Sequence, residues 1–434
     1  MTLRTCDMER AKDSFHLRET ASFLAEYAAL LSGCGATSIR IEKNTSRMAR
    51  AFGVNFDIFI MPAHVSVSVW DKDRTEAIVA QSKTVACGIN FTLNAALSRL
   101  SWEVADNHLD LSTASGLFER IRKAKPTGKW EVLILTSLAN ASFCRLFGGD
   151  WMAMLIVFVS TLAGYRLKQI MLEDKRDVRL TFLCASFFSA ALSAGGHIFN
   201  IGATPEIAVG TSVLYLIPGV PYINSVSDMI YRHYLCAFSR FLDAVVLTAC
   251  LSVGLCAGVF LLGLKWCCRL MWNDILINIF EDGFFAAIAA IGFSSISNTP
   301  RCAYLTLALI AAAGHAIRYV LTLPDFGGMH IIPASTVASF AIGVLSVLFA
   351  SRIKCPAEVC FFPALLPMIP GMYAYRTIEA LLSCLYHTQE EAFGHYFYLL
   401  AYNGLTCSFI ILGMVIGATM PVFLFKKLSF TATR

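Results

Sequence analysis

Residues 206–219 read E-I-A-V-G-T-S-V-L-Y-L-I-P-G, and residues 358–371 read E-V-C-F-F-P-A-L-L-P-M-I-P-G. In both segments a glutamate stands twelve positions before a Pro-Gly pair, with leucine and isoleucine at matching places between them. Proline removes a backbone N–H and glycine lets the chain turn, so each pair is expected to break a helix. Backbone groups freed inside a membrane are tolerated only where they face protein or line a cavity. The two segments therefore predict paired broken spans, which mark the binding site of many secondary transporters.

The composition divides the chain into a polar part and an apolar part. Hydrophobic residues make up 56% of the 434 residues and charged residues 15%, whereas soluble domains are about a quarter charged. Roughly one residue in four is charged within residues 1–129, and roughly one in nine within residues 130–434. The net charge of +5 gives no indication of nucleic-acid binding. We expect a polar domain at 1–129, followed by a membrane domain in two parts, 130–270 and 271–434.

Long apolar runs predict the spans of the membrane domain, because a spanning helix needs roughly 20 mostly apolar residues. Ten spans are predicted, at 131–148, 151–168, 180–200, 206–219, 238–263, 275–297, 303–322, 332–351, 357–371 and 397–425. Five spans per half is an odd number, so the second half must cross the membrane in the opposite sense. The predicted fold class is an α-helical polytopic membrane protein of two five-span inverted repeats, preceded by a small α+β cytoplasmic domain.

Loop charge and the amino-terminal sequence orient this arrangement. Twelve Lys and Arg residues fall on the side of the first domain and three on the opposite side. Positive charge marks the cytoplasmic side, so both termini of this multi-pass protein are expected in the cytoplasm. The first twenty residues lack the apolar core of a signal peptide, which also predicts that the first domain stays in the cytoplasm.

Ionisable residues within spans are costly and are therefore candidates for function. Asp228 follows the first Pro-Gly pair and stands four residues after Asn224, so both share one helical face. Arg318 and Arg376 are the candidate partners for an anion, and Glu281 and Asp282 lie near the start of the sixth span. The candidates for carrying a proton are Glu206, Glu358, Asp243, His197 and His315. The two glutamates could equally be first-turn residues at the membrane surface, and a lone histidine is more often a packing residue.

The first domain contains the stretch G-C-G-A-T-S-I-R-I-E-K-N-T-S-R-M-A-R-A-F-G at 33–53. The glycines end one helix, Thr37 or Ser38 can cap the next, and Arg40 is expected on a wetter face of it. Two alternating runs, 56–61 and 65–70, predict strands. No spacing of histidine or cysteine suggests a metal site, no cofactor is predicted, and no catalytic constellation stands out. A regulatory, assembly or cytoplasmic-gate role is favoured for this domain over an enzymatic one.

Two motifs resemble the bacterial threonine/serine exporter family. They are the run at 33–53 and the segment I-P-G-V-P-Y-I-N-S-V-S-D at 217–228, which is followed by Arg240. The resemblance covers nearly the whole chain and implies the form in which a soluble domain and ten spans are fused. It implies export of threonine and serine driven by the proton-motive force, whereas some split-subunit members are associated with succinate export. Five residues match the family pattern: Pro218, Gly219, Pro221, Asn224 and Asp228.

The second copy of the motif departs from the first. Pro370 and Gly371 match, but Ala380 stands where Asp228 would map, so an equivalent charged site is not expected there. We expect the substrate carboxylate near the half-helix after Gly219 and its ammonium and hydroxyl groups at Asp228 and Asn224.

Other interpretations stay open. A dicarboxylate substrate would need cationic partners such as Arg318 or Arg376. The membrane part could instead anchor a hydrolase-like enzyme, or it could form a channel. The sequence also leaves open whether copies of the chain assemble into a homo-oligomer.

Overall fold

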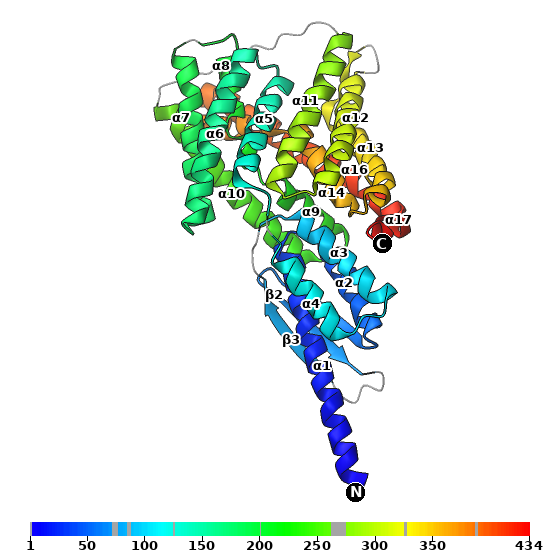
Figure 1. Cartoon of the computed structure of the whole chain (residues 1–434). Helices are drawn as coiled ribbons and strands as arrows, with labels where there is room; N and C mark the ends of the chain where they lie inside the picture. The colour runs from blue at the N-terminus through cyan, green and yellow to red at the C-terminus, as the bar shows by residue number, and fades with distance from the viewer. Residues whose placement is uncertain are drawn as a thin grey trace.

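A helical bundle with an elongated N-terminal domain at one end makes up the molecule (Figure 1). The computed structural model describes residues 2–71, 77–84, 88–124, 126–199, 201–261, 275–324, 328–386 and 389–434. The predicted boundary between the two membrane halves, at residues 270 and 271, lies outside the described residues.

The N-terminal domain combines helices with a small sheet, as predicted, but the sheet has a third strand, 77–83, beyond the two that the sequence indicated. Its elements are α1 (Thr2–Gly33), α2 (Ser38–Ala51), β1 (Asn55–Ile60), β2 (His64–Trp70), β3 (Ala77–Lys83), α3 (Phe91–Asp106) and α4 (Leu111–Arg122). The strands pair antiparallel in the order β1-β2-β3, so Trp70 lies opposite Asn55 on one side and Ala77 on the other. Side chains alternate between the faces of a strand, and every second residue of β2 is a buried valine. These valines pack on α1 in the core of the domain.

The bundle follows without further strands among the described residues. Its first half contains α5 (Lys129–Leu146), α6 (Trp151–Glu173), α7 (Val178–Ile198), α8 (Pro205–Thr211), the 3-10 turn η1 (Leu214–Leu216), α9 (Gly219–Ile230) and α10 (Tyr234–Leu261). Its second half contains α11 (Ile275–Ile296), η2 (Arg301–Ala303), α12 (Tyr304–Thr322), α13 (Ile331–Ile353), α14 (Ala357–Leu365), η4 (Leu366–Met368), α15 (Gly371–Tyr386), α16 (Glu390–Leu424) and α17 (Lys426–Thr431).

Within the described residues, seven helices are long and apolar enough to cross a membrane, or up to nine if each bent helix pair is one span. The predicted span at 131–148 corresponds to α5, which is outside this set. Its 18 residues include Lys129, Glu131 and Arg145, although the helix packs between α6 and α11 in the bundle (Figure 1). The presence of ten membrane spans therefore stays a prediction.

Both Pro-Gly pairs break a helix, as the sequence predicts. The segment from α8 through η1 bends by 56° before α9 begins at Gly219. The segment from α14 through η4 bends by 55° before α15 begins at Gly371. In both places a 3-10 turn precedes the pair, because proline cannot donate the hydrogen bond that would continue an α-helix.

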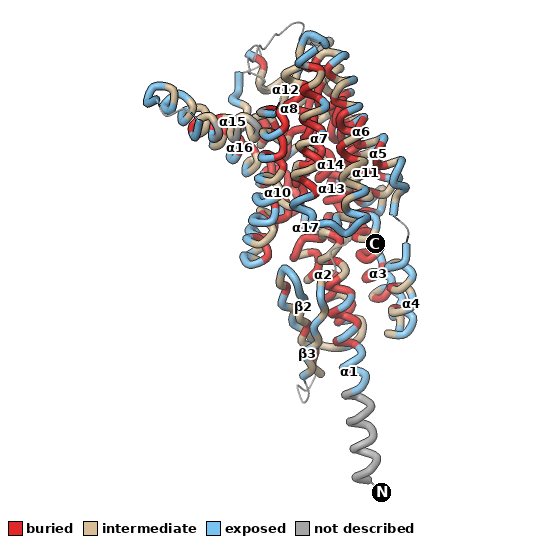
Figure 2. The backbone as a smooth tube through the Cα atoms, turned by 90° about the vertical axis from the view of Figure 1, so that its left-hand side faces the viewer, coloured by how far each residue is buried: buried red, intermediate tan, exposed pale blue. Residues whose placement is uncertain are grey.

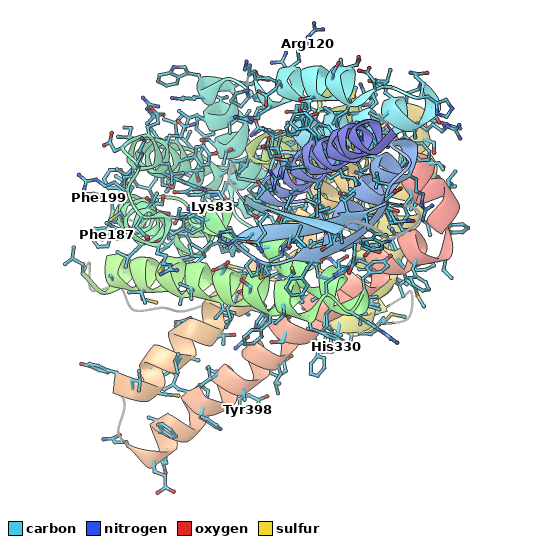
Figure 3. The ribbon with its side chains drawn as sticks, turned by 90° about the horizontal axis from the view of Figure 1, so that it is seen from below. Lys83, Arg120, Phe187, Phe199, His330 and Tyr398 are labelled. Carbon is cyan, nitrogen blue, oxygen red and sulfur yellow. The ribbon has the colours of Figure 1, made fainter. Side chains whose placement is uncertain are left out.

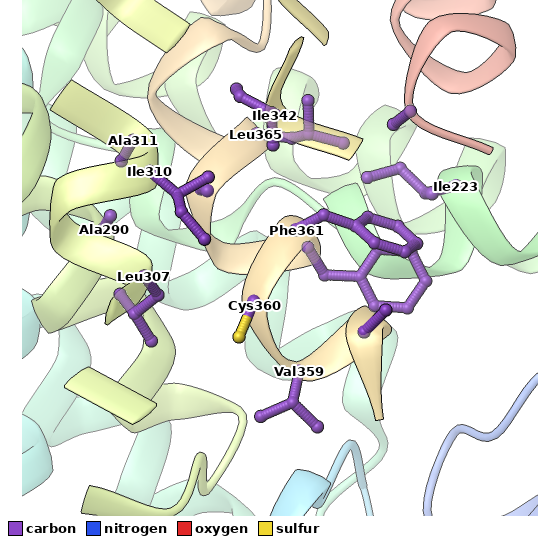
Figure 4. Packing of buried hydrophobic residues seen from close by; sticks show 14 of the residues in the cluster. Ile223, Ala290, Leu307, Ile310, Ala311, Ile342, Val359, Cys360, Phe361 and Leu365 are labelled. Carbon is purple, nitrogen blue, oxygen red and sulfur yellow. The ribbon is translucent and has the colours of Figure 1, made fainter. Parts of the chain in front are cut away.

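The core of the second half is built around α14. Every residue of α14 is buried, which is unusual for a helix of nine residues and follows from its position between α11, α12 and α13. Figure 4 shows Phe361 and Leu365 of α14 among Ile223 of α9, Ile310 of α12 and Ile342 of α13. This packing holds both ends of α14 in place, with Glu358 at one end and the second break at the other.

The helices α15 and α16 form a hairpin that projects from the bundle (Figures 2 and 3). Its outer part carries exposed apolar side chains, among them Leu385, Tyr386, Phe397 and Tyr398. Figure 2 shows buried residues throughout the bundle and in the N-terminal domain, including α2, where the domain meets the bundle. The exposed apolar side chains of the hairpin suit contact with lipid.

Candidate functional site at the two helix breaks

The first break packs directly against the second. A Cβ atom added to Gly219 would lie 2.6 Å from Cδ1 of Ile369 and 2.8 Å from Cδ2 of Leu366. Carbon atoms in contact are separated by about 3.5–4.0 Å, so a larger residue at the start of α9 would force the ends of the Ile369 and Leu366 side chains to move. The proximity of these two segments, 150 positions apart in the chain, is not visible in the sequence.

The second break repeats this contact in reverse. A Cβ atom added to Gly371 would lie 2.9 Å from Cδ2 of Leu214 and 3.3 Å from Cδ1 of Ile217. These two residues occupy the positions in the first segment that Leu366 and Ile369 occupy in the second. Each glycine therefore receives the equivalent side chains of the other break.

A cavity of about 90 Å³ lies at this contact. It is mainly apolar, and its wall includes Pro218, Gly219, Pro221, Leu366, Ile369 and, from the N-terminal domain, Ile89. Tyr215 and Ser297 are residues of the wall that carry a hydroxyl group. Three residues predicted to bind substrate thus line one cavity, next to backbone that is free of helical hydrogen bonding.

Asn224 and Asp228 lie further along α9 and face the N-terminal domain. The Asn224 side chain donates a hydrogen bond from Nδ2 to the backbone oxygen of Gly35 at 2.9 Å. Gly35 has φ +86°, a conformation that glycine adopts without strain, and this turn presents its carbonyl to α9. The two residues predicted to share a helical face are therefore both engaged by one loop, 35–38.

The carboxylate of Asp228 is fully buried and has two partners. Its Oδ1 accepts the backbone N–H of Ser38 at 2.9 Å, and its Oδ2 accepts Nη1 of Arg240 at 2.8 Å. Ser38 begins α2, so Asp228 caps that helix from another domain, where the positive end of the helix dipole favours an anion. Thr37 occupies the N-cap position of α2, as expected, but its side chain makes no capping hydrogen bond, and Asp228 supplies the acceptor instead.

Arg240 completes this contact by bridging the two domains. Its second terminal nitrogen, Nη2, donates to the backbone oxygen of Ala36 at 2.9 Å while Nη1 holds Asp228. The sequence does not predict Arg240 as a site residue. Its position shortly after the Pro-Gly motif is the one feature of the sequence that points to a role in the site. A guanidinium with several fixed donors is suited to this double role.

Arg40 joins the N-terminal domain to the other half of the bundle. Its side chain is buried and pairs with Glu358 of α14, with Nε to Oε1 at 3.2 Å and Nη2 to Oε2 at 2.5 Å. The expected exposure of Arg40 is therefore wrong, because the partner that compensates its charge comes from a distant segment. Of the two interpretations of Glu358, a buried acid and a surface residue, the structure shows the buried one.

A second, weaker ion pair lies at the rim of the interface. Oε2 of Glu42 lies 3.5 Å from Nε2 of His233, in the connection between α9 and α10. The hydrogen bond from His233 lowers the pKa of the Glu42 carboxyl below its ordinary value of 4.5, although partial burial opposes the shift.

The other candidate residues are not gathered at this junction. Glu206 is half-buried in the first turn of α8, Asp243 is exposed on α10, and Arg376 is half-buried on α15. The side chain of His197 lies outside the described residues. His315 and Arg318 do meet, in a buried cluster that Asp282 completes near the second break.

Two family models match the chain. One, described as "Putative threonine/serine exporter", matches residues 22–262, which is more than half of the chain. The other, described as "Threonine/Serine exporter, ThrE", matches residues 282–424. The junction between α2 and α9 falls within the first match and the second break within the second.

Relatives with printed names fall into two groups. A Mycobacterium tuberculosis protein named "Probable threonine/serine exporter" is 20% identical over 383 residues, covering 85% of this chain and 71% of its own. A Klebsiella aerogenes protein named "Probable succinate transporter subunit YjjP" is 25% identical over 256 residues, covering 58% of this chain and 98% of its own. The Escherichia coli protein of that name is 26% identical over 234 residues, covering 53% of this chain and 90% of its own.

No solved structure matches the chain. The family models together extend over both halves of the bundle and most of the N-terminal domain. The chain belongs to the threonine/serine exporter family, and it is a transporter rather than an enzyme.

Proposed function

We propose that this protein exports threonine or serine from the bacterial cytoplasm across the inner membrane, driven by the proton-motive force. The observation that carries the proposal is the meeting of two helix breaks around a cavity, with Asn224 and Asp228 on the helix that starts there. Family membership and the M. tuberculosis relative support this class of substrate.

The membrane domain is proposed to have ten spans in two five-span halves of opposite orientation, with α5 as the first span. The reciprocal contacts of Gly219 and Gly371 support this, because a two-fold relation between halves pairs equivalent residues in both directions. Rocking of one half against the other would then change access to the cavity between them.

The N-terminal domain is proposed to close the cytoplasmic side of the transport path, and both termini are placed in the cytoplasm. Its loop 35–38 occupies the polar groups of Asn224, Asp228 and Arg240, while Arg40 holds Glu358. This conformation therefore has its cytoplasmic gate shut. A substrate arriving from the cytoplasm must displace the loop before it reaches Asp228.

A zwitterionic substrate fits the charges of this site. Once the loop withdraws, the Asp228 carboxylate loses the N–H of Ser38 and can accept the substrate ammonium group, while Arg240 remains beside it. The start of α9 at Gly219 lies nine residues, about 13 Å along the helix, from Asp228, which is farther than the two charged groups of one amino acid can reach. The substrate carboxylate is therefore placed beside Arg240 and not at the start of α9 as the sequence suggested.

Dicarboxylate export is the second candidate, favoured by the relatives named as succinate transporter subunits. A dianion needs two positive partners, and an acid at its binding site opposes it. Replacement of Asp228 by asparagine therefore separates the candidates, since it weakens binding of a zwitterion and favours a dianion.

Counterflow in proteoliposomes tests the proposal. Vesicles containing the full chain are preloaded with unlabelled threonine, serine or succinate, and uptake of the labelled compound is followed. Saturable exchange of threonine or serine, strongly reduced in Asp228→Asn, supports the proposal. Asp174→Asn, which removes an exposed carboxylate in the connection after α6, is the matched control and should leave exchange unchanged. Exchange of succinate alone overturns the substrate assignment.

A further inference from the structure

Three ionisable side chains form a continuous buried chain beside the second break. Asp282 of α11 contacts Nδ1 of His315 on α12, and Nε2 of the same ring lies 2.6 Å from Nη2 of Arg318. The side chains of His315 and Asp282 are only 4% and 14% exposed. Charged groups at such a depth are expensive, which makes a purely packing role for them costly.

The contacts with Asp282 and Arg318 favour a neutral His315 ring in this conformation. A guanidinium can only donate, so Nε2 of His315 must accept the hydrogen bond from Arg318. The proton of the neutral ring is then on Nδ1, where it is donated to the Asp282 carboxylate. A second proton on Nε2 would place two donors against each other and break the contact with Arg318.

Arg318 connects this histidine to the break. Its Nη1 donates to the backbone oxygen of Met368 at 3.1 Å. Met368 is followed directly by Ile369, which lines the cavity and packs on Gly219. A change in the position of Arg318 is therefore transmitted over one residue to the contact between the two breaks.

The other charged residues on the neighbouring helices α11 and α15 interact with groups outside the cluster: Glu281 of α11 pairs with Arg145 of α5, and Arg376 and Glu379 interact on α15. The turn η4 presents the carbonyl groups of Pro367 and Met368, and α15 presents Tyr373. The formal charges of α13 and α14 are Arg352, which is exposed, and Glu358, which is paired with Arg40 at the opposite end of α14.

The first half of the bundle has a polar network beside its own break, but that network is neutral. Nδ2 of Asn140 on α5 donates to Oγ1 of Thr161 on α6 at 2.7 Å and to the backbone oxygens of Thr211 and Ser212, at 3.1 and 3.3 Å. Neutral groups thus suffice to satisfy the backbone next to a break. The charges of Asp282, His315 and Arg318 are therefore not needed to satisfy the backbone at the second break, which indicates a further role for them.

We propose that Asp282, His315 and Arg318 form the proton-coupling site of the transporter, which rests on the export function proposed above. A hydronium ion transfers a proton to Nε2 of His315: one O–H bond breaks and leaves water, a new N–H bond forms, and the hydrogen bond from Arg318 is lost. The resulting imidazolium stays paired with Asp282. It repels Arg318, which weakens the hydrogen bond from Arg318 to the backbone oxygen of Met368. Loss of the proton on the other side of the membrane restores the contacts seen here.

The test compares exchange with gradient-driven transport in proteoliposomes. His315→Gln keeps a polar side chain of similar reach but cannot take up a proton. We expect this variant to retain threonine counterflow and to lose all stimulation of threonine transport by a pH gradient. Asp282→Asn, which removes the counterion of the imidazolium, should show the same loss. Retained counterflow also demonstrates that the variants are folded.

The exposed His330 at the start of α13 provides the matched control, since His330→Gln should keep the full response to the gradient. A normal gradient response in both His315→Gln and Asp282→Asn would overturn the coupling site while leaving the export function intact. Loss of counterflow in both variants would also overturn it, because the cluster would then serve binding or folding. Absence of threonine, serine and succinate exchange in the wild-type protein would instead reject the export function itself.

Discussion

Arg40 and Glu358 form a two-pronged ion pair across 318 positions of sequence, with both side chains removed from solvent. Arg40 belongs to the second helix of the N-terminal domain, and Glu358 to the first turn of the helix that leads to the second break. The pair therefore ties the proposed cytoplasmic gate to the segment that is proposed to move during transport.

Removing one member of this pair should destabilise the protein strongly. Arg40→Leu leaves the Glu358 carboxylate buried without its partner, which costs about 3–5 kcal/mol in comparable buried pairs. The double variant Arg40→Leu/Glu358→Leu should lose less, because no uncompensated charge remains. Thermal unfolding of the full chain in detergent measures both effects.

Arg50→Leu is the control for this comparison, since Arg50 is exposed on the same helix and its replacement should change the melting temperature little. Equal destabilisation by the single and the double variant would contradict the prediction. It would mean that the lost packing of the Arg40 stem, rather than its charge, decides the stability.

The sequence was sufficient to predict the local features of the site. Proline and glycine chemistry predicted helix breaks at Pro218-Gly219 and Pro370-Gly371, and both are present. The spacing of Asn224 and Asp228 predicted one shared face, and both side chains reach the same loop. These features depend on backbone geometry over a few residues, which the sequence determines directly.

Partners from distant segments could not be predicted in this way. Arg40 looks like an exposed residue on an amphipathic helix, because its compensating acid lies in the other half of the bundle. Asp282 looks like a residue near a helix end until His315 and Arg318 are placed beside it. A single sequence shows periodicity but carries no information on which distant faces meet.

The contact between the two breaks can be tested by filling it. Gly219→Ala places a Cβ atom 2.6 Å from Cδ1 of Ile369, and overpacking of this kind typically costs about 1–3 kcal/mol. We expect slower counterflow and a lower melting temperature. Ile369→Val removes that Cδ1 atom, so the double variant should recover part of both losses.

A reciprocal pair of variants checks this result. Gly371→Ala meets Leu214 at 2.9 Å and Ile217 at 3.3 Å, so Ile217→Val should relieve part of the effect and Ile369→Val should relieve none of it. Gly116→Ala, at a helical position of α4 with open space around it, should leave transport unchanged. Relief of either glycine variant by the unmatched valine would contradict a specific contact between the breaks.

The rim pair between Glu42 and His233 predicts a pH dependence of a definite sign. Because the hydrogen bond from His233 lowers the pKa of Glu42 below 4.5 in the folded protein, the carboxylate stabilises the docked domain at pH values above 4.5. This stabilisation is lost as the pH falls through the lowered pKa, and it is small because Glu42 is about half exposed. The melting temperature of Glu42→Gln should therefore lie slightly below that of the wild type at pH 6 and converge with it under acidic conditions.

Glu26→Gln, at an exposed position of α1, is the control, and its melting temperature should follow that of the wild type at every pH. A difference between Glu42→Gln and the wild type that persists or grows on acidification would show that the pair does not hold the domain.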